Sequence, residues 1–580
     1  MSAAITARKN GASVLVLEKD RVIGGTTARS GGVLWIPGNS LSRNAGIADD
    51  EERATSYLRH ATGQAFDARR VQAFLRNGPR MVDWFQKETS VKFVAVPEFP
   101  DYHPDTVGGL PGGRSILAAP FDGRELGKRF DWLRPPLREI TFVGMMFNAS
   151  QEIRHFFNVT RSLRSACYVA KRLTCHMYEL VMYRRAVRLT NGNALAARLA
   201  KTLFDLEVQF ELGAQVEGLE MEQGRVIGVT FRTEHGLKTV SATKGVILAA
   251  GGFPQDLARR KELFGPAGEQ HMSPAPKANT GDGLRLAETV GGVVDATLPN
   301  PAAWIPVSRV AHSDGTVGAF PHLIDRYKPG VVMVNRGGLR FTNESNSYHD
   351  VGIAMREACV EGSDMAAFLI CDSVSLKRYG LGYVKPHPVL HGHHLRSGYL
   401  LKANSLSELA QTAGIDPVAL QQTLEEFNEG ARQGVDRQFG RGESAYNRFL
   451  GDAQHSPNPC VAPLERGPFY AIRVGLGDLG TFAGISTDEY ARVLDQDRKV
   501  VDGLYAVGND AVSVMGGAYP GGGITLGPAM TFGFVAGEHV ANTAKPAADV
   551  SAGHASRHNL STSNDAVEVP SFRRALPNFW

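Results

Sequence analysis

The stretch "MSAAITARKNGASVLVLEK" (Met1–Lys19) combines a helix, a stop and a buried strand. Ser2–Asn10 is rich in small residues and predicts a helix, and Gly11 stands where a helix commonly ends. Val14–Leu17 is an unbroken apolar run, typical of a strand buried in a parallel sheet. Glu18 follows at the carboxyl end of that strand, where dinucleotide-binding folds place an acidic residue that holds ribose hydroxyls. The stretch therefore predicts the second strand of a dinucleotide-binding unit.

A dinucleotide-binding unit normally starts with a strand and a G-x-G-x-x-G turn, and the printed sequence shows neither before Ser2. Two interpretations are open at this point: such a fold without its first strand and phosphate loop, or a different fold with a similar stretch. The residues that follow favour the first. "RVIGGTTARSGGVLW" (Arg21–Trp35) comes directly after the strand, and Gly24 and Gly25 let its backbone approach a phosphate or a ring.

Two further apolar strands also run into glycines, "KGVILAAGGFP" (Lys244–Pro254) and "GLYAVGND" (Gly503–Asp510). Parallel strands commonly end in this way before a loop that faces a ligand. Residues Gln215–Thr233 alternate apolar and polar side chains around Gln223-Gly224, which predicts a β-hairpin. The plainer interpretation is that these are merely strands of an α/β fold; their glycine endings together favour a ligand site. Either way, the sequence predicts the α/β class.

The composition is that of a globular chain with room for two domains. The 580 residues are 43% hydrophobic and 21% charged, and the formal net charge of +4 is too small to indicate a nucleic-acid partner. The five cysteines form no C-x-x-C pair, which is typical of a reduced chain, and no metal site is expected. Because no signal peptide or membrane-spanning run is evident, we expect a cytoplasmic location.

The segment from about 145 to 189 has a helical stripe with few acids around it. The stripe consists of Phe156, Val159, Leu163, Cys167, Ala170, Met177 and Val181, and five arginines lie off it: Arg154, Arg161, Arg172, Arg184 and Arg185. One interpretation packs the stripe on the body and leaves a solvated basic face. The other is a basic amphipathic element that contacts anionic membrane lipid, which would make the chain a peripheral membrane protein.

Five motifs give a more specific indication: "LEKDRVIGGTTARSGG", "AAGGF", "ANTGDG", "RFTNES" and "YPGGGITLGPAMTFGFVAG". Together they resemble the flavoprotein family of fumarate reductases and 3-ketosteroid dehydrogenases, from Met1 to about Ala541. Within that family, "FPDY" (Phe99–Tyr102), "NESNSY" (Asn343–Tyr348) and "YPGGG" (Tyr519–Gly523) resemble the 3-ketosteroid Δ1-dehydrogenases.

The resemblance implies a Rossmann-like FAD-binding domain with an inserted α+β catalytic domain. We expect residues 1–297 and 467–544 to form the FAD-binding domain, 298–466 the catalytic domain, and 545–580 a poorly ordered tail. It also implies that the first strand and the G-x-G-x-x-G turn are missing as a block, and that Met1 is an internal methionine. A chain from Met1 is then expected to be poorly soluble or flavin-free, with roughly 15–25 upstream residues restoring flavin and activity.

The resemblance implies FAD as the cofactor and supplies its contacts position by position. The matching positions are Glu18, Gly24, Gly25, Thr26, Thr27, Ser30, Gly31, Gly32, Val216, Ala250, Gly251, Asp282, Gly508, Asn509, Thr525 and Leu526. Of these, Glu18 and the glycine-rich loop also follow from the residues themselves. The others rest on the resemblance.

Four positions match the family's catalytic site. Tyr519 and the N–H of Gly523 match the donors that hold the C3 carbonyl oxygen of a steroid, where they stabilise an enolate. Tyr348 matches the base that removes the C2 proton, and Tyr102 matches its neighbour. A lone tyrosine is more often an amphipathic core residue, so the assignment depends on all four occurring together. Gly523 is expected to keep the backbone open to a bulky ligand.

The resulting expectation is Δ1-dehydrogenation of a 3-ketosteroid or a similar large cyclic ketone, with an electron acceptor that the sequence does not identify. A dicarboxylate substrate is disfavoured because "MGGAYPGGGITLG" contains no arginine to bind a carboxylate. Three alternatives stay open: a Δ4-dehydrogenase of 5α-reduced ketosteroids, a relative resembling fumarate reductase, and a truncated product that binds no flavin and is not an enzyme.

Overall fold

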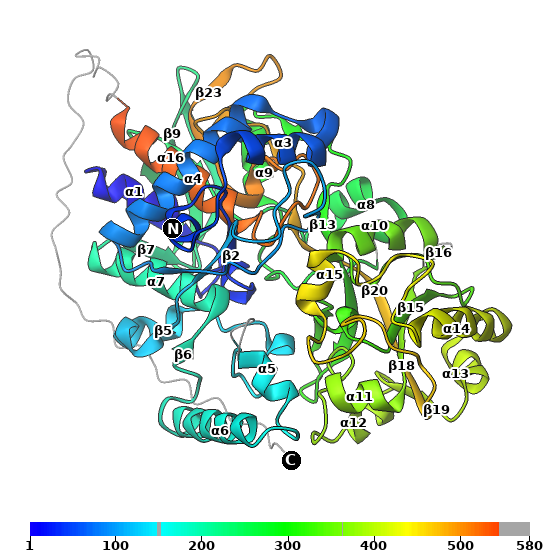
Figure 1. The fold of residues 1–580 in the computed structure, drawn as a ribbon. Helices are drawn as coiled ribbons and strands as arrows, with labels where there is room; N and C mark the ends of the chain where they lie inside the picture. Colours follow the sequence, from blue (N-terminus) through cyan, green and yellow to red (C-terminus); the bar gives the residue numbers. More distant parts are fainter. Residues whose placement is uncertain (148–151, 269, 362–363, 544–580) are drawn as a thin grey trace, which may run out of the picture.

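The computed structural model describes residues 1–147, 152–268, 270–361 and 364–543, so the expected tail at 545–580 lies outside the described residues. Two bodies lie side by side, each built around a six-stranded sheet (Figure 1). The second body comprises approximately residues 302–481, and the first body holds the chain on either side of it. Helices and sheets are mixed in both, which confirms the α/β class.

The sheet of the first body joins an antiparallel meander to a pair of parallel strands. Its members are β8 (Gln215–Glu222), β9 (Arg225–Thr233), β10 (Gly236–Ser241), β11 (Val246–Leu248), β22 (Arg492–Leu494) and β23 (Val500–Ala506). The pairing of β8 with β9 confirms the predicted hairpin. Because β11 and β23 run parallel, the glycine-containing loops after them open at the same edge of the sheet.

The opening stretch forms the predicted elements to within a residue. Ser2–Lys9 is helix α1, and Leu15–Glu18 is strand β1, which pairs in parallel with β7 (Gln209–Leu212). Within the described part of the chain, β1 and β7 form a two-stranded sheet of their own. The expectation of a further strand and glycine turn upstream stays a prediction.

Helix α1 packs against α16 (Leu526–Asn542), although the two are far apart in sequence. The Ser2 hydroxyl donates to the Met530 carbonyl over 2.8 Å. Close approach depends on Gly537, because a Cβ there would lie 2.6 Å from the Ala3 carbonyl oxygen. Further helices of the first body are α2 (Ser40–Asn44), α3 (Glu51–Thr62), α4 (Ala68–Glu88), α7 (Asn191–Asp205), α8 (Leu257–Phe264) and α9 (Asp282–Thr289).

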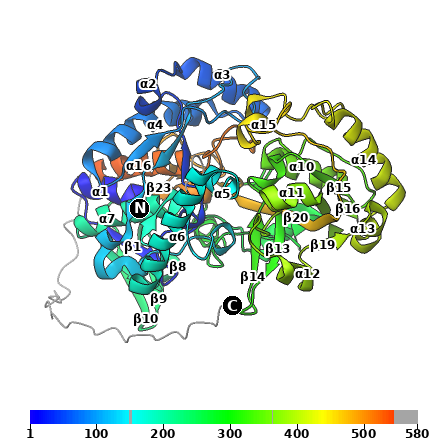
Figure 2. The same cartoon turned by 60° about the horizontal axis from the view of Figure 1, so that its bottom comes forward.

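The sheet of the second body is antiparallel, in the order β14-β13-β20-β18-β15 with β19 beside β20. Its strands are β13 (Ala302–Ala311), β14 (Val317–Pro321), β15 (Val331–Asn335), β18 (Ala367–Cys371), β19 (Leu401–Ala403) and β20 (Phe469–Thr481). Helices α13 (Leu406–Ala413) and α14 (Pro417–Ala431) lie at its outer side in both ribbon views (Figure 2). Since β20 is a central strand here, we propose that the second body ends after Thr481 rather than at 466.

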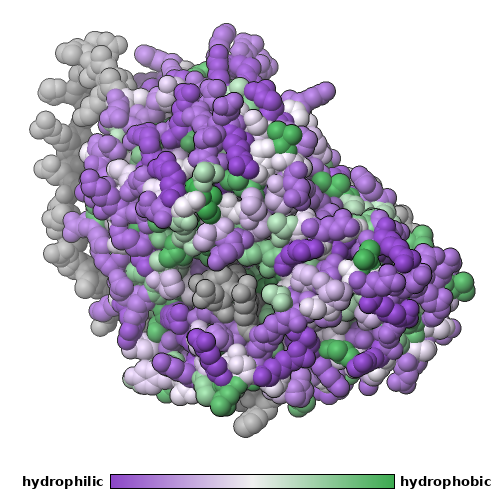
Figure 3. Space-filling model, viewed as in Figure 1, coloured by the Kyte–Doolittle hydropathy of each residue, from purple (hydrophilic) through white to green (hydrophobic). Residues whose placement is uncertain are grey.

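Helices α5 (Glu152–Phe157) and α6 (Leu163–Tyr183) form the predicted helical segment, at the lower edge of Figure 1. The part of the predicted stripe on α6 faces outward, with Leu163 82% exposed and Val181 75%, whereas Phe156 and Val159 are half-buried. For α6, this contradicts the interpretation in which the stripe packs on the body, while Phe156 on α5 does pack against Phe147. Apolar side chains are visible at that edge in the space-filling view (Figure 3). Among the described helices, none has the length and hydrophobicity that crossing a bilayer requires.

Candidate active site

Three tyrosines meet at the junction of the two bodies. Tyr102 lies in the loop between β3 (Phe93–Ala95) and β4 (Ser115–Ala118), Tyr348 begins α10 (Tyr348–Ala358), and Tyr519 precedes α16. The Tyr102 hydroxyl donates to the Tyr348 hydroxyl over 2.9 Å, and the rings of Tyr348 and Tyr519 are centred 4.9 Å apart. All three side chains are buried. The structure thus brings together three of the residues expected to be catalytic.

Burial makes each of these hydroxyls a weak acid. Desolvation raises the pKa of Tyr102 and of Tyr348 well above the ordinary value near 10. It also raises the pKa of Tyr519 to about 12, although hydrogen bonds with Tyr348 and Thr525 partly offset the effect. The hydroxyls are therefore good hydrogen-bond donors, whereas a base among them needs groups that stabilise its ionised form.

The loop that carries Tyr102 is fixed by its buried neighbour Asp101. The Asp101 carboxylate accepts from the Trp35 indole over 2.8 Å and from the Arg114 guanidinium over 2.8 Å. Burial nevertheless raises the pKa of Asp101 to about 6. The Tyr102 N–H donates to the Pro520 carbonyl over 2.9 Å, which ties this loop to the segment of Tyr519. Sequence reasoning missed Asp101, whose only signal was its place in "FPDY".

Gly523 is held against β2 (Val33–Trp35) in a conformation that favours glycine. Its φ is +101°, and a Cβ there would lie 2.5 Å from the Val33 carbonyl oxygen. The Gly523 carbonyl accepts from the N–H groups of Trp35 and Gly527, whereas its own N–H donates to no acceptor in the described chain. From the sequence, we expected glycine at position 523 because it leaves room for a ligand. The structure adds a second reason, which is the close contact with the β2 backbone.

Two more tyrosines, from the second body, extend this cluster. The ring of Tyr446, in α15 (Ala445–Leu450), is centred 4.5 Å from that of Tyr102. Its hydroxyl lies 2.8 Å from the Tyr327 hydroxyl, and both side chains are fully buried. Sequence reasoning missed both residues because neither lies in one of the motifs.

The predicted cofactor residues at the end of β1 leave acceptors and backbone groups available. One Glu18 carboxylate oxygen accepts from the Asp20 N–H over 2.9 Å, and burial raises the pKa of this carboxyl.

In the glycine-rich loop that follows, Gly24 and Gly25 both have positive φ, at +106° and +48°. Asn279 donates to the Thr26 hydroxyl, which links this loop to the one before α9. In the same loop Ser30 donates to the Thr27 carbonyl and accepts from Gly32 N–H, while Gly31 adjoins them.

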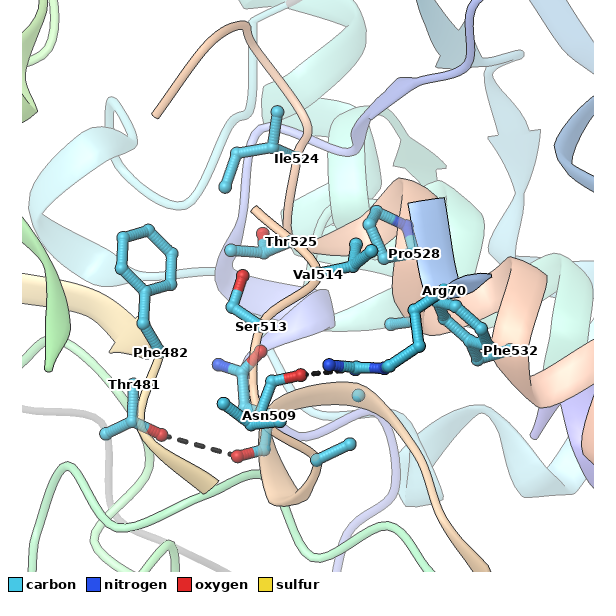
Figure 4. A pocket seen from close by; sticks show the side chains of 14 residues that line it. Arg70, Thr481, Phe482, Asn509, Ser513, Val514, Ile524, Thr525, Pro528 and Phe532 are labelled. Atoms are coloured by element: carbon cyan, nitrogen blue, oxygen red, sulfur yellow. Dashed lines mark hydrogen bonds between the residues drawn. The ribbon is translucent and has the colours of Figure 1, made fainter. Parts of the chain in front are cut away.

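A cavity lies at the N-terminus of α16 (Figure 4). The predicted residues Gly508, Asn509 and Thr525 line it, and Leu526 begins the helix beside it. Arg70, from α4, also lines the cavity, and its buried Nε atom has no hydrogen-bond partner among the residues that the structure describes. A helix N-terminus and a guanidinium beside a cavity suit the polar and anionic groups of FAD, so the residues present fit this cofactor.

The other predicted cofactor residues differ in their surroundings. Asp510 accepts from the Ala250 N–H over 2.6 Å and holds the turn at Gly251. Burial raises the pKa of its carboxyl to about 6. Asp510 was not among the cofactor residues predicted from the sequence. Asp282 pairs with Lys19 over 2.6 Å, which joins α9 to the end of β1. Val216 packs in a small apolar cluster beside β1.

Comparisons with known proteins agree with this arrangement. The family model described as "FAD binding domain" matches residues 1–526. A 4-oxocyclohex-2-ene-1-carboxylate 5-dehydrogenase from Sinomonas cyclohexanicum is 40% identical over 94% of this chain and 92% of its own length. A 3-oxosteroid 1-dehydrogenase from Mycobacterium tuberculosis (H37Rv) is 36% identical over 94% of this chain and 96% of its own.

Among solved structures, a 3-ketosteroid Δ1-dehydrogenase from Sterolibacterium denitrificans, in complex with 1,4-androstadiene-3,17-dione, superimposes with a TM-score of 0.84. It is 34% identical and aligns with 93% of this chain and 97% of its own. The family match covers most of the chain, including the glycine-rich loop, the tyrosines and the lining of the cavity up to Thr525. The chain therefore belongs to the FAD binding domain family, and FAD is its cofactor.

Proposed function

We propose that this chain is a dehydrogenase that introduces the C1–C2 double bond into a 3-ketosteroid. The observation that carries the proposal is the buried cluster of Tyr102, Tyr348 and Tyr519; Gly523, whose N–H donates to no acceptor in the described chain, follows Tyr519 in the same segment. Two donors aimed at one carbonyl oxygen and a hydroxyl close to them are what abstraction of a proton next to a ketone requires.

In this assignment the Tyr519 hydroxyl and the Gly523 N–H donate hydrogen bonds to the C3 carbonyl oxygen. Both donors are held before substrate arrives, Tyr519 by ring contacts with Tyr102 and Tyr348 and Gly523 by the β2 backbone. Their geometry therefore does not have to reorganise as negative charge grows on that oxygen. The C–H bonds at C2 become more acidic as a result.

Tyr348 accepts the C2 proton at its hydroxyl oxygen, to which the Tyr102 hydroxyl donates a hydrogen bond. The electron pair of the C2–H bond becomes the second bond of C1=C2 as C1 loses a hydride. When bound, FAD supplies the acceptor of that hydride. The electron acceptor that FAD then serves is left open.

A second candidate substrate is a monocyclic ketone that carries a carboxylate, because the relative that is 40% identical is named for 4-oxocyclohex-2-ene-1-carboxylate. The ring carbonyl would use the same two donors. The two substrates differ in the carboxylate, for which the segment 515–527 offers no arginine.

Anaerobic flavin reduction distinguishes these candidates. We expect the holoprotein to bleach rapidly with a 4-ene-3-ketosteroid, weakly with 4-oxocyclohex-2-ene-1-carboxylate and not with succinate. Tyr348→Phe is the control for a reaction that uses this site. Faster bleaching by the monocyclic acid would make it the substrate, and bleaching by neither ketone would refute the proposed activity.

We also propose that α6 contacts an anionic membrane surface. Leu163, Met177 and Val181 are exposed, and Arg164 and Lys171 are exposed beside them. The single acid of the helix, Glu179, accepts from the Val187 N–H and so is held toward the body. An outward face that is apolar and cationic complements an anionic lipid surface.

Co-sedimentation with vesicles tests this contact. We expect binding to phosphatidylcholine vesicles that contain phosphatidylglycerol, weaker binding at high salt, and loss in the double variant Leu163→Ser/Val181→Ser. Val418→Ser in α14, where the side chain is 76% exposed, is the matched control. Equal binding by the double variant and this control would contradict the proposal, as would no binding by the unaltered protein.

A further inference from the structure

Two consecutive carbonyl groups of the segment that follows Tyr519 are bound by the sheet of β2, β4 and β3. The Gly522 carbonyl accepts from the Ser115 hydroxyl over 2.9 Å, and the Gly523 carbonyl accepts from the Trp35 N–H over 3.1 Å. Ser115 and Trp35 are cross-strand partners where β4 pairs with β2. Neighbouring donors of one sheet therefore hold neighbouring carbonyls of the segment.

A hydrogen bond to one side of a peptide unit also sets the direction of its other side. The bond between Gly522 and Gly523 is a trans peptide, in which the C=O and N–H groups point in opposite directions within one plane. Because the Gly522 carbonyl points to Ser115 on β4, the Gly523 N–H points away from β4. This N–H is the group that is proposed above to bind the C3 carbonyl oxygen.

The peptide unit that Ser115 holds borders the tyrosine cluster. A Cβ at Gly522 would lie 2.8 Å from ring carbons of Phe99 and 3.5 Å from the Tyr102 hydroxyl oxygen. A Cβ at Gly521 would lie 2.4 Å from the indole nitrogen of Trp35, on the side of β2. The segment is thus packed between the sheet and the tyrosines, and a rotation of its peptide units would change its contacts with both.

The Ser115 side chain is itself held in place. It is 1% exposed, and the rest of β4, Ile116–Ala118, is apolar and buried. A buried hydroxyl is costly without a hydrogen bond, so its bond to the Gly522 carbonyl is favoured. The preceding Arg114 anchors the start of the strand, because its buried guanidinium donates to Asp49 over 2.7 Å and to Asp101 over 2.8 Å.

We propose that Ser115 is a positioning residue that orients and strengthens the Gly523 N–H as a donor to the substrate carbonyl. The inference rests on the proposed function, in which that N–H stabilises an enolate. The hydroxyl fixes the peptide plane before substrate binds. By bonding to the Gly522 oxygen it also polarises the amide, which makes the N–H a better donor. Both effects matter most as negative charge grows on the C3 oxygen, so they act on the rate more than on steroid binding.

Ser115→Ala in the holoprotein tests the proposal by rate and by spectrum. Flavin reduction by a 4-ene-3-ketosteroid should slow about tenfold, less than the roughly 10²–10³ lost with a direct oxyanion donor. Steroid affinity should stay within about twofold. The C=O stretch of a bound 1,4-diene-3-ketosteroid, isotope-labelled at C3, should move to higher wavenumber because its hydrogen bond weakens. Ser115→Cys, whose thiol is a weaker donor than a hydroxyl, should fall between the two proteins.

Ser375→Ala is the matched control, because this buried hydroxyl donates to the Pro329 carbonyl over 3.1 Å in the second body. It should leave both the rate and the C=O band unchanged. Flavin content and thermal midpoint establish that each variant is folded. A lower midpoint in Ser115→Ala with an unmoved band would indicate a structural role and overturn the proposal, as would an unchanged rate of flavin reduction.

Tyr519→Phe separates failure of this inference from failure of the proposed function. If the band moves in Tyr519→Phe but not in Ser115→Ala, the carbonyl is bound at this site and only the inference is refuted. If the protein oxidises no steroid, the proposed activity fails, and the band of the bound ketone in Ser115→Ala still decides the inference. A band that neither variant moves, or a holoprotein without a bound carbonyl band, would refute both.

Discussion

The Tyr102 hydroxyl donates to the Tyr348 hydroxyl over 2.9 Å, although the two residues are 246 positions apart and belong to different bodies. The rings stand nearly perpendicular, at 84°, and Tyr519 contacts both. Neither body contains the complete site. Any change in how the bodies dock therefore alters this hydrogen bond directly.

Tyr348→Phe keeps the ring and removes the hydroxyl that is proposed as the base. Steroid binding should be nearly unchanged, because Tyr519 and Gly523 are the residues proposed to hold the carbonyl, whereas flavin reduction should slow by several orders of magnitude. Equilibrium binding of a steroid, followed by stopped-flow flavin reduction, measures the two effects separately. Reduction at the original rate would remove Tyr348 from the mechanism.

Glu18→Ala should weaken FAD retention without changing the preferred ketone. The carboxylate lies at the end of β1 and accepts one hydrogen bond from Asp20; its other oxygen has no hydrogen-bond partner among the described residues and can bind ribose hydroxyls. The flavin-to-protein ratio after dialysis gives the affinity, and relative rates with several ketones give the preference. Glu18→Gln, which keeps an acceptor oxygen, should lose less flavin; an unchanged ratio in both variants would refute the assignment.

Gly523→Ala should destabilise the fold and remove activity together. The alanine would have to keep a φ near +101°, and its Cβ would press on the Val33 carbonyl oxygen. The backbone strain alone is worth on the order of 1–3 kcal/mol. Gly46→Ala is the control: it has φ +82° with nothing within 4 Å of its Cβ, and so carries strain without contact. If both variants lose equal stability, measured by urea unfolding, the β2 contact contributes nothing.

Acid should destabilise the protein through His349, next to the site. Burial lowers the pKa of this imidazole to about 4, and the ring accepts from the Trp304 N–H while contacting the Gly517 carbonyl. Since an unfolded histidine titrates near 6.5, the folded state binds fewer protons between pH 6.5 and 4, so stability falls as pH falls through this window. The loss amounts to about 3 kcal/mol.

The variant His349→Asn, which keeps an acceptor for Trp304, isolates this effect. Asp101 and Asp510, with pKa values raised to about 6, have the opposite pH dependence and are common to both proteins. The difference in unfolding free energy between the two proteins should therefore shrink from pH 7 to pH 4. A difference that stays constant across this range would contradict the assigned pKa.

The local pattern was enough to predict the elements whose chemistry lies in consecutive residues. Helix α1, strand β1 and the β8–β9 hairpin follow from apolar periodicity and glycines, and they form as predicted. Asp101 and Tyr446 could not be found in this way, because their roles arise from partners far away in sequence, such as Arg114 and Tyr102.

Two larger features depended on tertiary pairing in the same way. The residues of β20 do not show to which body the strand belongs. Only its pairing with β13 and β18 places it in the second body. The stripe on α6 was visible in the sequence. Which way it faces was not, because periodicity gives the face of a helix but not its partner.

The packing of α1 on α16 also has a consequence for folding during synthesis. Ser2 reaches its acceptor, Met530, only after a further 528 residues have been joined. At about 5–20 residues per second this takes roughly half a minute to two minutes. During that interval the apolar face of α1 is without α16, and the second body completes its sheet only once β20 has been made, shortly before Met530. The nascent first body is thus the part of the chain that a holding chaperone would have to protect.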